Sequence, residues 1–485
     1  MKSLFKDHKK PNDHSRSLPV LIAAALLSFA LVASCAMPLQ WGDIPMDIEG
    51  LSAENWLGDL DALSAEMRGH PKLGADQAAA AAFDAAIAET KASLRAAGAE
   101  DPQELADIAV AGIQKALAAI GDGHTRINAS SQMIFPVILK FFPDTSFPEA
   151  SDIEAASGWD ARIAATDAAH QEDLGAIVAK IGDKTIAEAV EAISAYLSLE
   201  SAVRISPAQA LFHYAIRFEI MDAFTDPWLM RSLGLADGTT LTMTIQREGQ
   251  SESTVIFNLG EPPSPWVRVL DSITETPFTR SHPGSSWWYG SPAGCEDIVY
   301  FRYDDCSTEA RPVMDELLAV LPDMDDELAN PSHLIVDLRY NSGGDSRPGT
   351  YFARNLTGKK VSAVQGGVII LVSGATYSSA MMNTADIMKA CGATGASAGR
   401  SILMGEPLIE PLRHYGEIRR FPLPNSGIMI GRSTRLWKYD ETTGIRPARG
   451  VLEPAAENIV VQGFDDYAIG RDTTFERALE IIGQD

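Results

Sequence analysis

The amino-acid sequence predicts an α/β protein with a helical N-terminal part and a mixed central part. Its second half alternates strand patterns at 297–303, 334–338 and 368–372 with helix patterns at 308–321 and 379–391. Such alternation is typical of a parallel sheet covered by helices. The chain has 485 residues, of which 46% are hydrophobic and 22% charged, so it can bury a large core. This length predicts two or three domains.

The first 35 residues have the pattern of a targeting segment. A basic start, including Lys2, Lys10 and Arg16, precedes the apolar run 18–33, which is shorter than the roughly 20 residues of a membrane-spanning helix. The run ends in Leu31-Val-Ala-Ser-Cys35, which resembles the lipobox of bacterial lipoproteins. That resemblance implies a signal peptide over 1–35 and lipidation of Cys35; a plain secretory signal is the alternative. We expect an exported protein, lipid-anchored to a bacterial cell membrane and facing the periplasm.

Residues 36–50 are interpreted as a tether, and residues 51–129 as a helical domain. Leu51, Trp56, Leu60 and Met67 recur at helical spacing, and 104–119 form another amphipathic run. The domain closes with Gly121-Asp-Gly-His124-Thr125. Its glycines interrupt the helix and place a histidine at a turn.

Residues 130–265 are predicted to form a mixed domain. A strand with a Gly-Asp turn near 174–186, a helix at 186–197 and strands at 240–247 and 253–259 follow in order. This order resembles a PDZ module expanded by a helical insert at 198–235; a generic α+β domain is the alternative. Residues 266–485 are assigned to the α/β domain, and 262–292 to a linker or surface loop.

Charge and cysteine content limit the partners and the covalent chemistry. The formal net charge of −25 repels phosphate backbones, so we do not expect a nucleic-acid partner. Cys295 and Cys306 flank the 297–303 strand, which would hold them too far apart for a disulfide. No cysteine pair has zinc-site spacing, and no metal site is predicted.

Two glycine-bearing segments each follow an apolar strand. The first reads Asp337-Leu-Arg-Tyr-Asn-Ser-Gly343-Gly344, and the second reads Gly374-Ala-Thr-Tyr-Ser378-Ser379-Ala. The first offers backbone amides that can approach a ligand, and the second offers paired hydroxyls at a helix start. Acyl transfer needs both, because an oxyanion must be stabilised beside the nucleophile.

The first segment resembles the Asp-Leu-Arg-x-Asn-x-Gly-Gly signature of the C-terminal processing peptidases and their tricorn-like relatives. Thr376-Tyr-Ser378-Ser-Ala falls at the nucleophile position of that family. The resemblance implies a crotonase-like (ClpP-type) α/β spiral, Ser378 as the nucleophile, and no metal or organic cofactor. It implies an oxyanion hole from the amide of Gly343 or Gly344 and that of Ser379. Ser379 is the competing nucleophile.

The base that activates the serine distinguishes two branches of this family. Processing peptidases use a lysine about 25 residues after the serine, but position 403 is leucine and 402–413 contain no lysine. The tricorn-like branch uses an upstream histidine, and His124 stands where that resemblance places it. A histidine suits general-base work near neutral pH. We expect His124 to lie within hydrogen-bond reach of Ser378; a structural turn histidine is the alternative.

The carboxylate that orients His124 is not identified by the sequence, with Glu406, Glu417 and Glu441 as candidates. Leu408-Ile-Glu-Pro and Ala455 depart from the family pattern. Gly395-Ala-Ser397-Ala-Gly399 fits a nucleophile elbow in letters only, because a helix precedes it and a strand follows. The sequence therefore predicts a serine peptidase that acts on peptide or protein substrates. A peptide- or hydrophobic-ligand-binding protein on the same scaffold is the alternative.

Overall fold

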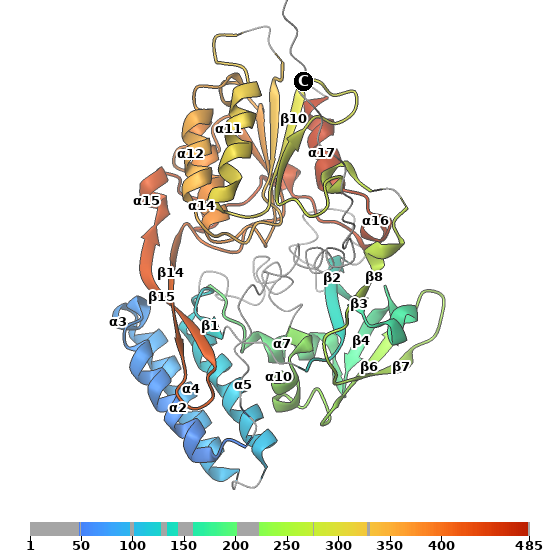
Figure 1. The fold of residues 1–485 in the computed structure, drawn as a ribbon, viewed down its shortest axis with the longest axis vertical. Helices are drawn as coiled ribbons and strands as arrows, with labels where there is room; N and C mark the ends of the chain where they lie inside the picture. The colour runs from blue at the N-terminus through green and yellow to red at the C-terminus, as the bar shows by residue number, and fades with distance from the viewer. Residues whose placement is uncertain are drawn as a thin grey trace, which may run out of the picture.

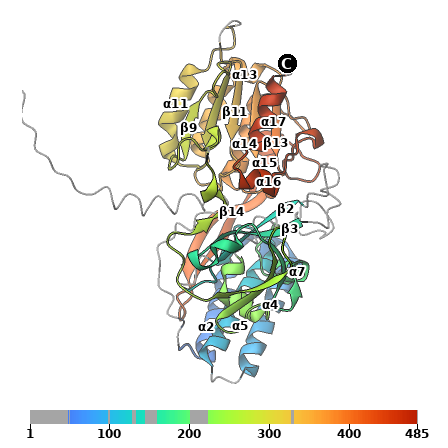
Figure 2. The same cartoon turned by 90° about the vertical axis from the view of Figure 1, so that its right-hand side faces the viewer.

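The structure is a computed structural model that describes residues 48, 50–97, 101–127, 133–143, 159–200, 223–274, 276–326 and 330–483. An α/β body occupies the upper half of Figure 1. Below it, a group of helices lies on one side and a β-sheet with short helices on the other, an arrangement that Figure 2 shows from the side. The protein is thus a mixed α/β fold with several sheets, as the sequence predicts. The predicted signal peptide 1–35, with Cys35, and most of the predicted tether lie outside the described residues.

The N-terminal helices are α2 (Ala53–Met67), α3 (Pro71–Ala75), α4 (Gln77–Ala96) and α5 (Pro102–Ile120). Ser52 caps α2 in a capping box, and Asp76 and Asp101 accept from the first amides of α4 and α5. Helix α5 ends at Gly121, whose φ of 70° is the left-handed conformation that glycine adopts without strain. This helix end directs the chain into the turn that carries His124.

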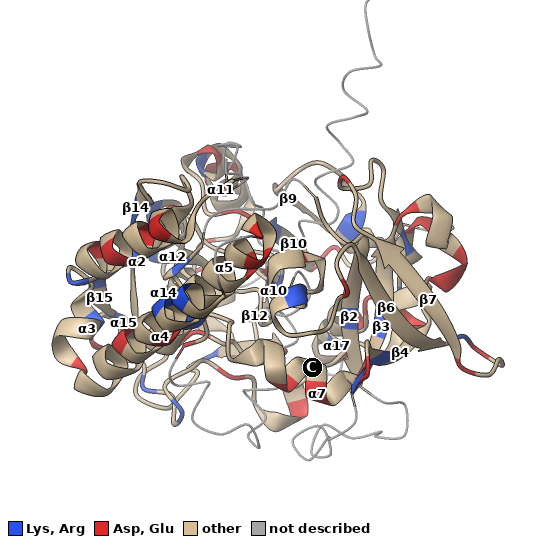
Figure 3. Cartoon of the chain, turned by 90° about the horizontal axis from the view of Figure 1, so that it is seen from below, with Lys and Arg blue, Asp and Glu red and all other residues tan. Residues whose placement is uncertain are grey.

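Charged residues of both signs lie on these helices (Figure 3). Lys91 Nζ lies 2.5 Å from Asp61 Oδ1, and Lys115 Nζ lies 2.8 Å from Glu89 Oε2, so each ion pair links two neighbouring helices. Within the described residues, no helix has both the length and the hydropathy required to cross a bilayer.

A long hairpin reaches down from the α/β body to the helices (Figure 1). It consists of β14 (Arg413–Pro422) and β15 (Met429–Lys438), and β1 (Arg126–Ile127) pairs antiparallel with β15. Phe421 and Ile430 of the hairpin share a buried cluster with Trp56 and Leu60 of α2. The hairpin therefore joins the α/β body to the segment that carries His124. Sequence periodicity did not predict it.

The central sheet has the order β2-β3-β4-β6-β7. Its strands are β2 (Val137–Pro143), β3 (Trp159–Thr166), β4 (Ile177–Ile181), β6 (Thr240–Gln246) and β7 (Ser253–Asn258), with β5 (Lys184–Thr185) and β8 (Val267–Arg268) paired alongside. Helices α7 (Ile186–Ser194) and α10 (Pro227–Ser232) accompany it. Strands β4 to β7 lie at the predicted positions, whereas β2, β3 and β8 were not predicted. Residues 201–222 of the predicted insert lie outside the described residues.

The sheet of the α/β body has the order β13-β12-β11-β10-β9. Its strands are β9 (Trp287–Gly290), β10 (Ile298–Tyr303), β11 (His333–Asp337), β12 (Val368–Val372) and β13 (Ser401–Gly405). Strands β10 to β13 run parallel, as predicted. Helices α11 (Arg311–Val320), α12 (Arg347–Leu356) and α14 (Ser379–Ala390) pack on one face, and α17 (Thr473–Ile482) packs on the other. Shorter helices are α13 (Lys360–Ala363), α15 (Tyr439–Thr443) and α16 (Phe464–Ala468).

The assignment of 262–292 to a linker or surface loop was wrong in part. Residues 287–290 form β9, which pairs antiparallel with β10 at the edge of the sheet. Trp287, Trp288 and Tyr289 supply the aromatic side chains that favour a half-buried strand, and Trp288 is buried. Cys295, Cys306 and Cys391 are all free thiols, in agreement with the expectation of no bridge between Cys295 and Cys306.

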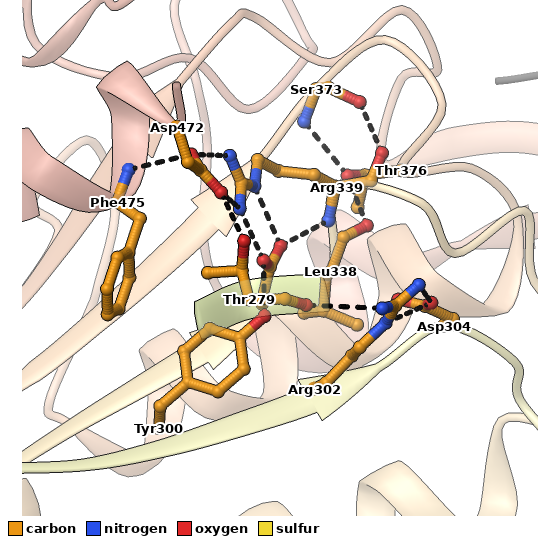
Figure 4. Close-up of polar contacts among 11 residues, drawn as sticks. Thr279, Tyr300, Arg302, Asp304, Leu338, Arg339, Ser373, Thr376, Asp472 and Phe475 are labelled. Carbon is orange, nitrogen blue, oxygen red and sulfur yellow. Dashed lines mark hydrogen bonds and ion pairs between the residues drawn. The ribbon is translucent and has the colours of Figure 1, made fainter. Parts of the chain in front are cut away.

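A buried ion-pair network lies at the end of β11 (Figure 4). The Arg339 guanidinium donates to Asp337 Oδ2 at 2.6 Å and to Asp472 Oδ1 at 2.6 Å. Asp472 also accepts from the Thr279 hydroxyl at 2.6 Å and from the Phe475 amide at 3.1 Å. The network ties the start of α17 to the strand that leads to Gly343. Because these charged groups are bound to one another, we assign the network to holding the fold.

Candidate active site

Ser378 lies in the turn between β12 and α14, with φ 53° and ψ −123°. This conformation is unusual for a residue with a side chain and commonly marks a functional turn. The loop after β11 holds the turn, because Thr376 Oγ1 donates to the Leu338 carbonyl at 2.8 Å and the Tyr377 amide donates to the Asn341 carbonyl at 3.1 Å. Two neighbouring parallel strands thus bring their following loops together at one sheet edge.

Gly343 comes so close to this turn, and Gly344 so close to Cys306, that a side chain at either position would clash. A Cβ on Gly343 would lie 2.7 Å from Ser378 Cβ, and one on Gly344 would lie 2.3 Å from the Cys306 carbonyl oxygen. Their φ values of 108° and 126° also favour glycine. The glycine backbone therefore lies directly against Ser378, as the two-segment pattern predicts.

The backbone amides of Gly343, Gly344 and Ser379 differ in whether they already donate a hydrogen bond within the protein. The Gly343 amide donates to Asn341 Oδ1 at 2.9 Å. The amides of Gly344 and Ser379 make no hydrogen bond to the described part of the chain. The Ser379 hydroxyl donates to the Gly344 carbonyl at 2.7 Å. Of the two glycine amides that the sequence left open as oxyanion donors, only that of Gly344 is free to bind a ligand.

His124 reaches Ser378 from the helical part of the chain. Its Nε2 lies 3.0 Å from Ser378 Oγ, across a separation of 254 residues. This distance agrees with the hydrogen-bond reach that the sequence analysis expects. The His124 amide donates to Asp122 Oδ1 at 3.0 Å, which fixes the turn around the ring. Tyr377 packs against the imidazole with ring centroids 4.9 Å apart.

A buried carboxyl group, Glu410, lies on the other side of His124. Its Oε1 is 3.4 Å from His124 Nδ1 and 3.7 Å from His414 Nε2. Its Oε2 accepts a short hydrogen bond from the Ser378 amide. The His414 ring stacks on His124 with centroids 5.9 Å apart. Ser378, His124 and Glu410 thus lie in a row of hydroxyl, imidazole and carboxyl groups, in which the 3.4 Å contact between His124 Nδ1 and Glu410 Oε1 is an ion-pair distance and not a hydrogen bond.

Burial dominates the protonation of these groups. It raises the pKa of Glu410 well above its ordinary value, and the nearby charge of Glu200 acts in the same direction. Burial lowers the pKa of His124 to about 3, against the opposing charge of Asp122. Burial also lowers the pKa of His414 to about 4. At neutral pH the two imidazoles are therefore neutral, and Nε2 of His124 can accept a proton from a hydroxyl.

Asp122 holds the turn that carries His124. It accepts from His70 Nε2 at 2.8 Å and from the Thr125 hydroxyl at 2.5 Å. His70 Nδ1 accepts the Lys72 amide, so the ring proton is on Nε2 and points to Asp122. Burial raises the pKa of Asp122, but the hydrogen bonds from His70 and Thr125 are among the effects that outweigh it and hold that pKa below its ordinary value.

Asp122, His124 and Glu200 are buried and present possible ligand atoms within 4.8 Å of one another, the spacing that a metal ion requires. Both carboxylates already accept hydrogen bonds, Asp122 from His70 and Glu200 from the Gly123 amide. His124 Nε2 faces Ser378. We therefore assign this group to hydrogen bonding within the protein.

Sequence reasoning missed Glu410. Of the three carboxylates that it considered, Glu417 lies 3.5 Å from Arg435 and Glu441 lies 2.7 Å from Arg413. Glu410 belongs to Leu408-Ile-Glu-Pro, a segment that departs from the family pattern. In the sequence, Glu410 is a lone acidic residue between Ile409 and Pro411 in an apolar stretch. In the structure, every residue of this stretch is buried.

The two rival assignments lie elsewhere. Lys389, a lysine that α14 carries between Ser378 and position 403, donates from Nζ to the Thr442 carbonyl at 2.9 Å and is exposed. The segment 395–399 follows helix α14 and precedes strand β13, the reverse of the order in a nucleophile elbow.

No protein-family model matches the chain, and no curated protein matches it. Solved structures match it by fold. Mature CPAF gives a TM-score of 0.51 at 11% identity, over 88% of this chain and 96% of that chain. A serine-to-alanine mutant of CPAF gives 0.53 at 11% identity, over 89% and 98%. The photosystem II D1 C-terminal processing protease gives 0.33 at 12% identity, over 87% and 98%.

The chain therefore has the overall fold of CPAF. This likeness is one of fold alone, because the identity is 11%.

Proposed function

We propose that this protein is a serine peptidase that cleaves peptide or protein substrates. The observation that carries the proposal is the 3.0 Å contact between His124 Nε2 and Ser378 Oγ. A hydroxyl at a strained turn, a neutral imidazole and a buried carboxyl group in series are the parts that nucleophilic acyl transfer requires.

In the proposed mechanism, Ser378 Oγ attacks the carbonyl carbon of the scissile peptide bond while His124 Nε2 takes the hydroxyl proton. Glu410 lies beside Nδ1 and, when ionised, stabilises the imidazolium and favours the tautomer with its proton on Nδ1. The free amides of Gly344 and Ser379 donate to the oxyanion, and Ser379 begins α14, whose positive dipole end adds to the stabilisation. His124 returns the proton to the leaving amine, and water then hydrolyses the acyl-enzyme.

Finer features of the fold form part of the proposal. The parallel strands β10 to β13 with helices on both faces suit a crotonase-like α/β spiral over 266–485. The strand order within 130–265, with α7 after β5, suits a PDZ-like domain. The helical domain 51–129 then supplies the base, and the α/β domain supplies the nucleophile.

We propose that the protein is exported and anchored to a bacterial membrane by a lipid on Cys35, facing the periplasm. The basis is the lipobox-like sequence Leu31-Val-Ala-Ser-Cys35 after a short apolar run. Cys35→Ser should release the protein from the membrane fraction or leave the precursor unprocessed. A mature wild-type protein whose intact mass shows another N-terminus and no acyl group would refute the anchor.

The test of the enzyme proposal is covalent labelling by a fluorophosphonate probe, which reacts with activated serines. Wild-type protein should label, and Ser378→Ala and His124→Ala should not. Ser379→Ala is the matched control and should retain labelling, because its hydroxyl is bound to the Gly344 carbonyl. Absence of labelling in a folded wild type would favour the non-catalytic binding protein, and loss of labelling in Ser379→Ala alone would identify Ser379 as the nucleophile.

A further inference from the structure

Glu200 connects the two halves of the candidate site, although neither the motifs nor the mechanism uses it. It follows α7 in the central part of the chain, and its residue is only 6% exposed. Its Oε1 accepts from the Gly123 amide at 2.9 Å and from the Tyr377 hydroxyl at 3.4 Å. Gly123 directly precedes His124, and Tyr377 directly precedes Ser378.

The packing around this carboxyl group leaves little room for movement. A Cβ on Gly123 would lie 2.1 Å from the Tyr377 hydroxyl and 3.3 Å from Glu200 Oε1. The Tyr377 ring lies against His124. Three segments from separate parts of the chain therefore meet at one point, directly behind the 3.0 Å contact of His124 with Ser378.

Several ionisable groups face Glu200. Asp122 lies on the turn of His124, Lys72 on α3, Tyr377 on the serine turn, and Glu410 beside His124. Burial raises the pKa of Glu200 to about 8, and the charge of Asp122 adds to this effect. At neutral pH the group is therefore a neutral carboxylic acid that can still accept two hydrogen bonds through Oε1.

We propose that Glu200 is a positioning residue that sets the distance between His124 and Ser378. The proposal rests on the proposed function, because the distance matters only if the pair reacts. Glu200 touches neither reacting group. It holds the residue next to each of them, so removing it lets the histidine turn and the serine turn move relative to each other. A misplacement of about 1 Å in such a pair can lower a rate roughly 100-fold.

The experiment compares second-order rates of fluorophosphonate labelling at pH 7 for wild type, Glu200→Gln and Glu200→Ala. Glutamine keeps the size, the neutrality and the accepting oxygen, so its rate should stay within about threefold of wild type. Alanine removes the acceptor, and its rate should fall about 10- to 100-fold. Glu191→Ala, an exposed glutamate of α7, is the control and should match wild type. Thermal midpoints confirm that each variant is folded.

The pH dependence of the labelling rate adds a second measurement, which a purely structural role of Glu200 would leave unaffected. Above about pH 8 the wild-type rate should fall, because ionised Glu200 is repelled by Asp122 and Glu410; Glu200→Gln should not show this fall. If Glu200→Ala does not fold, Tyr377→Phe, which removes only the donor hydroxyl, should lower the rate several-fold. A folded Glu200→Ala or Tyr377→Phe that labels at the wild-type rate, or a glutamine variant as slow as alanine, overturns the proposal. An unreactive wild type overturns the peptidase function, and with it this role.

Discussion

Glu410→Gln is expected to lower reactivity strongly with little effect on folding. The substitution keeps the side-chain shape, and its carbonyl oxygen can still accept the Ser378 amide. It removes the charge that the ionised carboxyl group places 3.4 Å from His124 Nδ1. At that distance an ion pair is worth at most about 5 kcal/mol with an effective dielectric constant of about 20, or roughly 5,000-fold in rate. Because the glutamine dipole replaces part of this stabilisation, we expect the labelling rate to fall by about 100- to 1,000-fold.

The pH dependence of the wild-type rate should have a defined sign. Only ionised Glu410 favours the His124 tautomer that can accept the serine proton. Because burial raises the pKa of Glu410, reactivity should be lost as pH falls through a value above that of an ordinary carboxyl group. The residual rate of Glu410→Gln should lack this acid limb.

The assay is the rate of fluorophosphonate labelling between pH 4 and 9, with thermal midpoints measured in parallel. Glu417→Gln is the matched control, because Glu417 lies in β14, shortly after Glu410 in the chain, is exposed and pairs with Arg435. A folded Glu410→Gln that labels within threefold of wild type would refute the role of Glu410.

Three further predictions concern stability. Gly343→Ala should lower the free energy of unfolding by roughly 2–5 kcal/mol, because alanine is strained at positive φ and its Cβ would overlap Ser378. Gly395→Ala is the control, because Gly395 has open space around it and the substitution should cost only the φ strain of about 1–2 kcal/mol. Urea unfolding of the two variants measures the difference. Asp472→Asn should cost about 3–5 kcal/mol in the same assay, because it removes a partner of the buried Arg339; a cost under 1 kcal/mol would contradict this. Wild-type stability should fall by about 1.4 kcal/mol per pH unit between the unfolded pKa of Glu200 and its folded pKa of about 8, since only the folded chain keeps that proton. Glu200→Gln should therefore gain on wild type from pH 5 to 8, and a constant difference would contradict the raised pKa.

The sequence predicted best what depends on local pattern. Strands β10, β11 and β12 are short apolar runs bounded by turn residues, so their positions and parallel order could be inferred. The contact between His124 and Ser378 was expected from motif resemblance, since no periodicity relates residues 254 positions apart.

Features that depend on long-range packing could not be predicted. The hairpin β14–β15 is stabilised by burying Phe421 and Ile430 against α2, and its own residues do not signal that partner. Glu410 acquires its place only because the chain after β13 passes behind His124. A lone glutamate in an apolar stretch signals a buried acid, but not the ring that it faces. The sequence also does not show that Asn341 Oδ1 accepts the amide of Gly343, which leaves the Gly344 amide as the free one of the two.

The most direct test of the account is the identification of the labelled residue. Wild-type protein treated with a fluorophosphonate probe is digested, and the modified peptide is sequenced by tandem mass spectrometry. The account predicts a single adduct on Ser378 that is absent from His124→Ala. An adduct on Ser379 or Ser397, or none in a folded wild type, would contradict it.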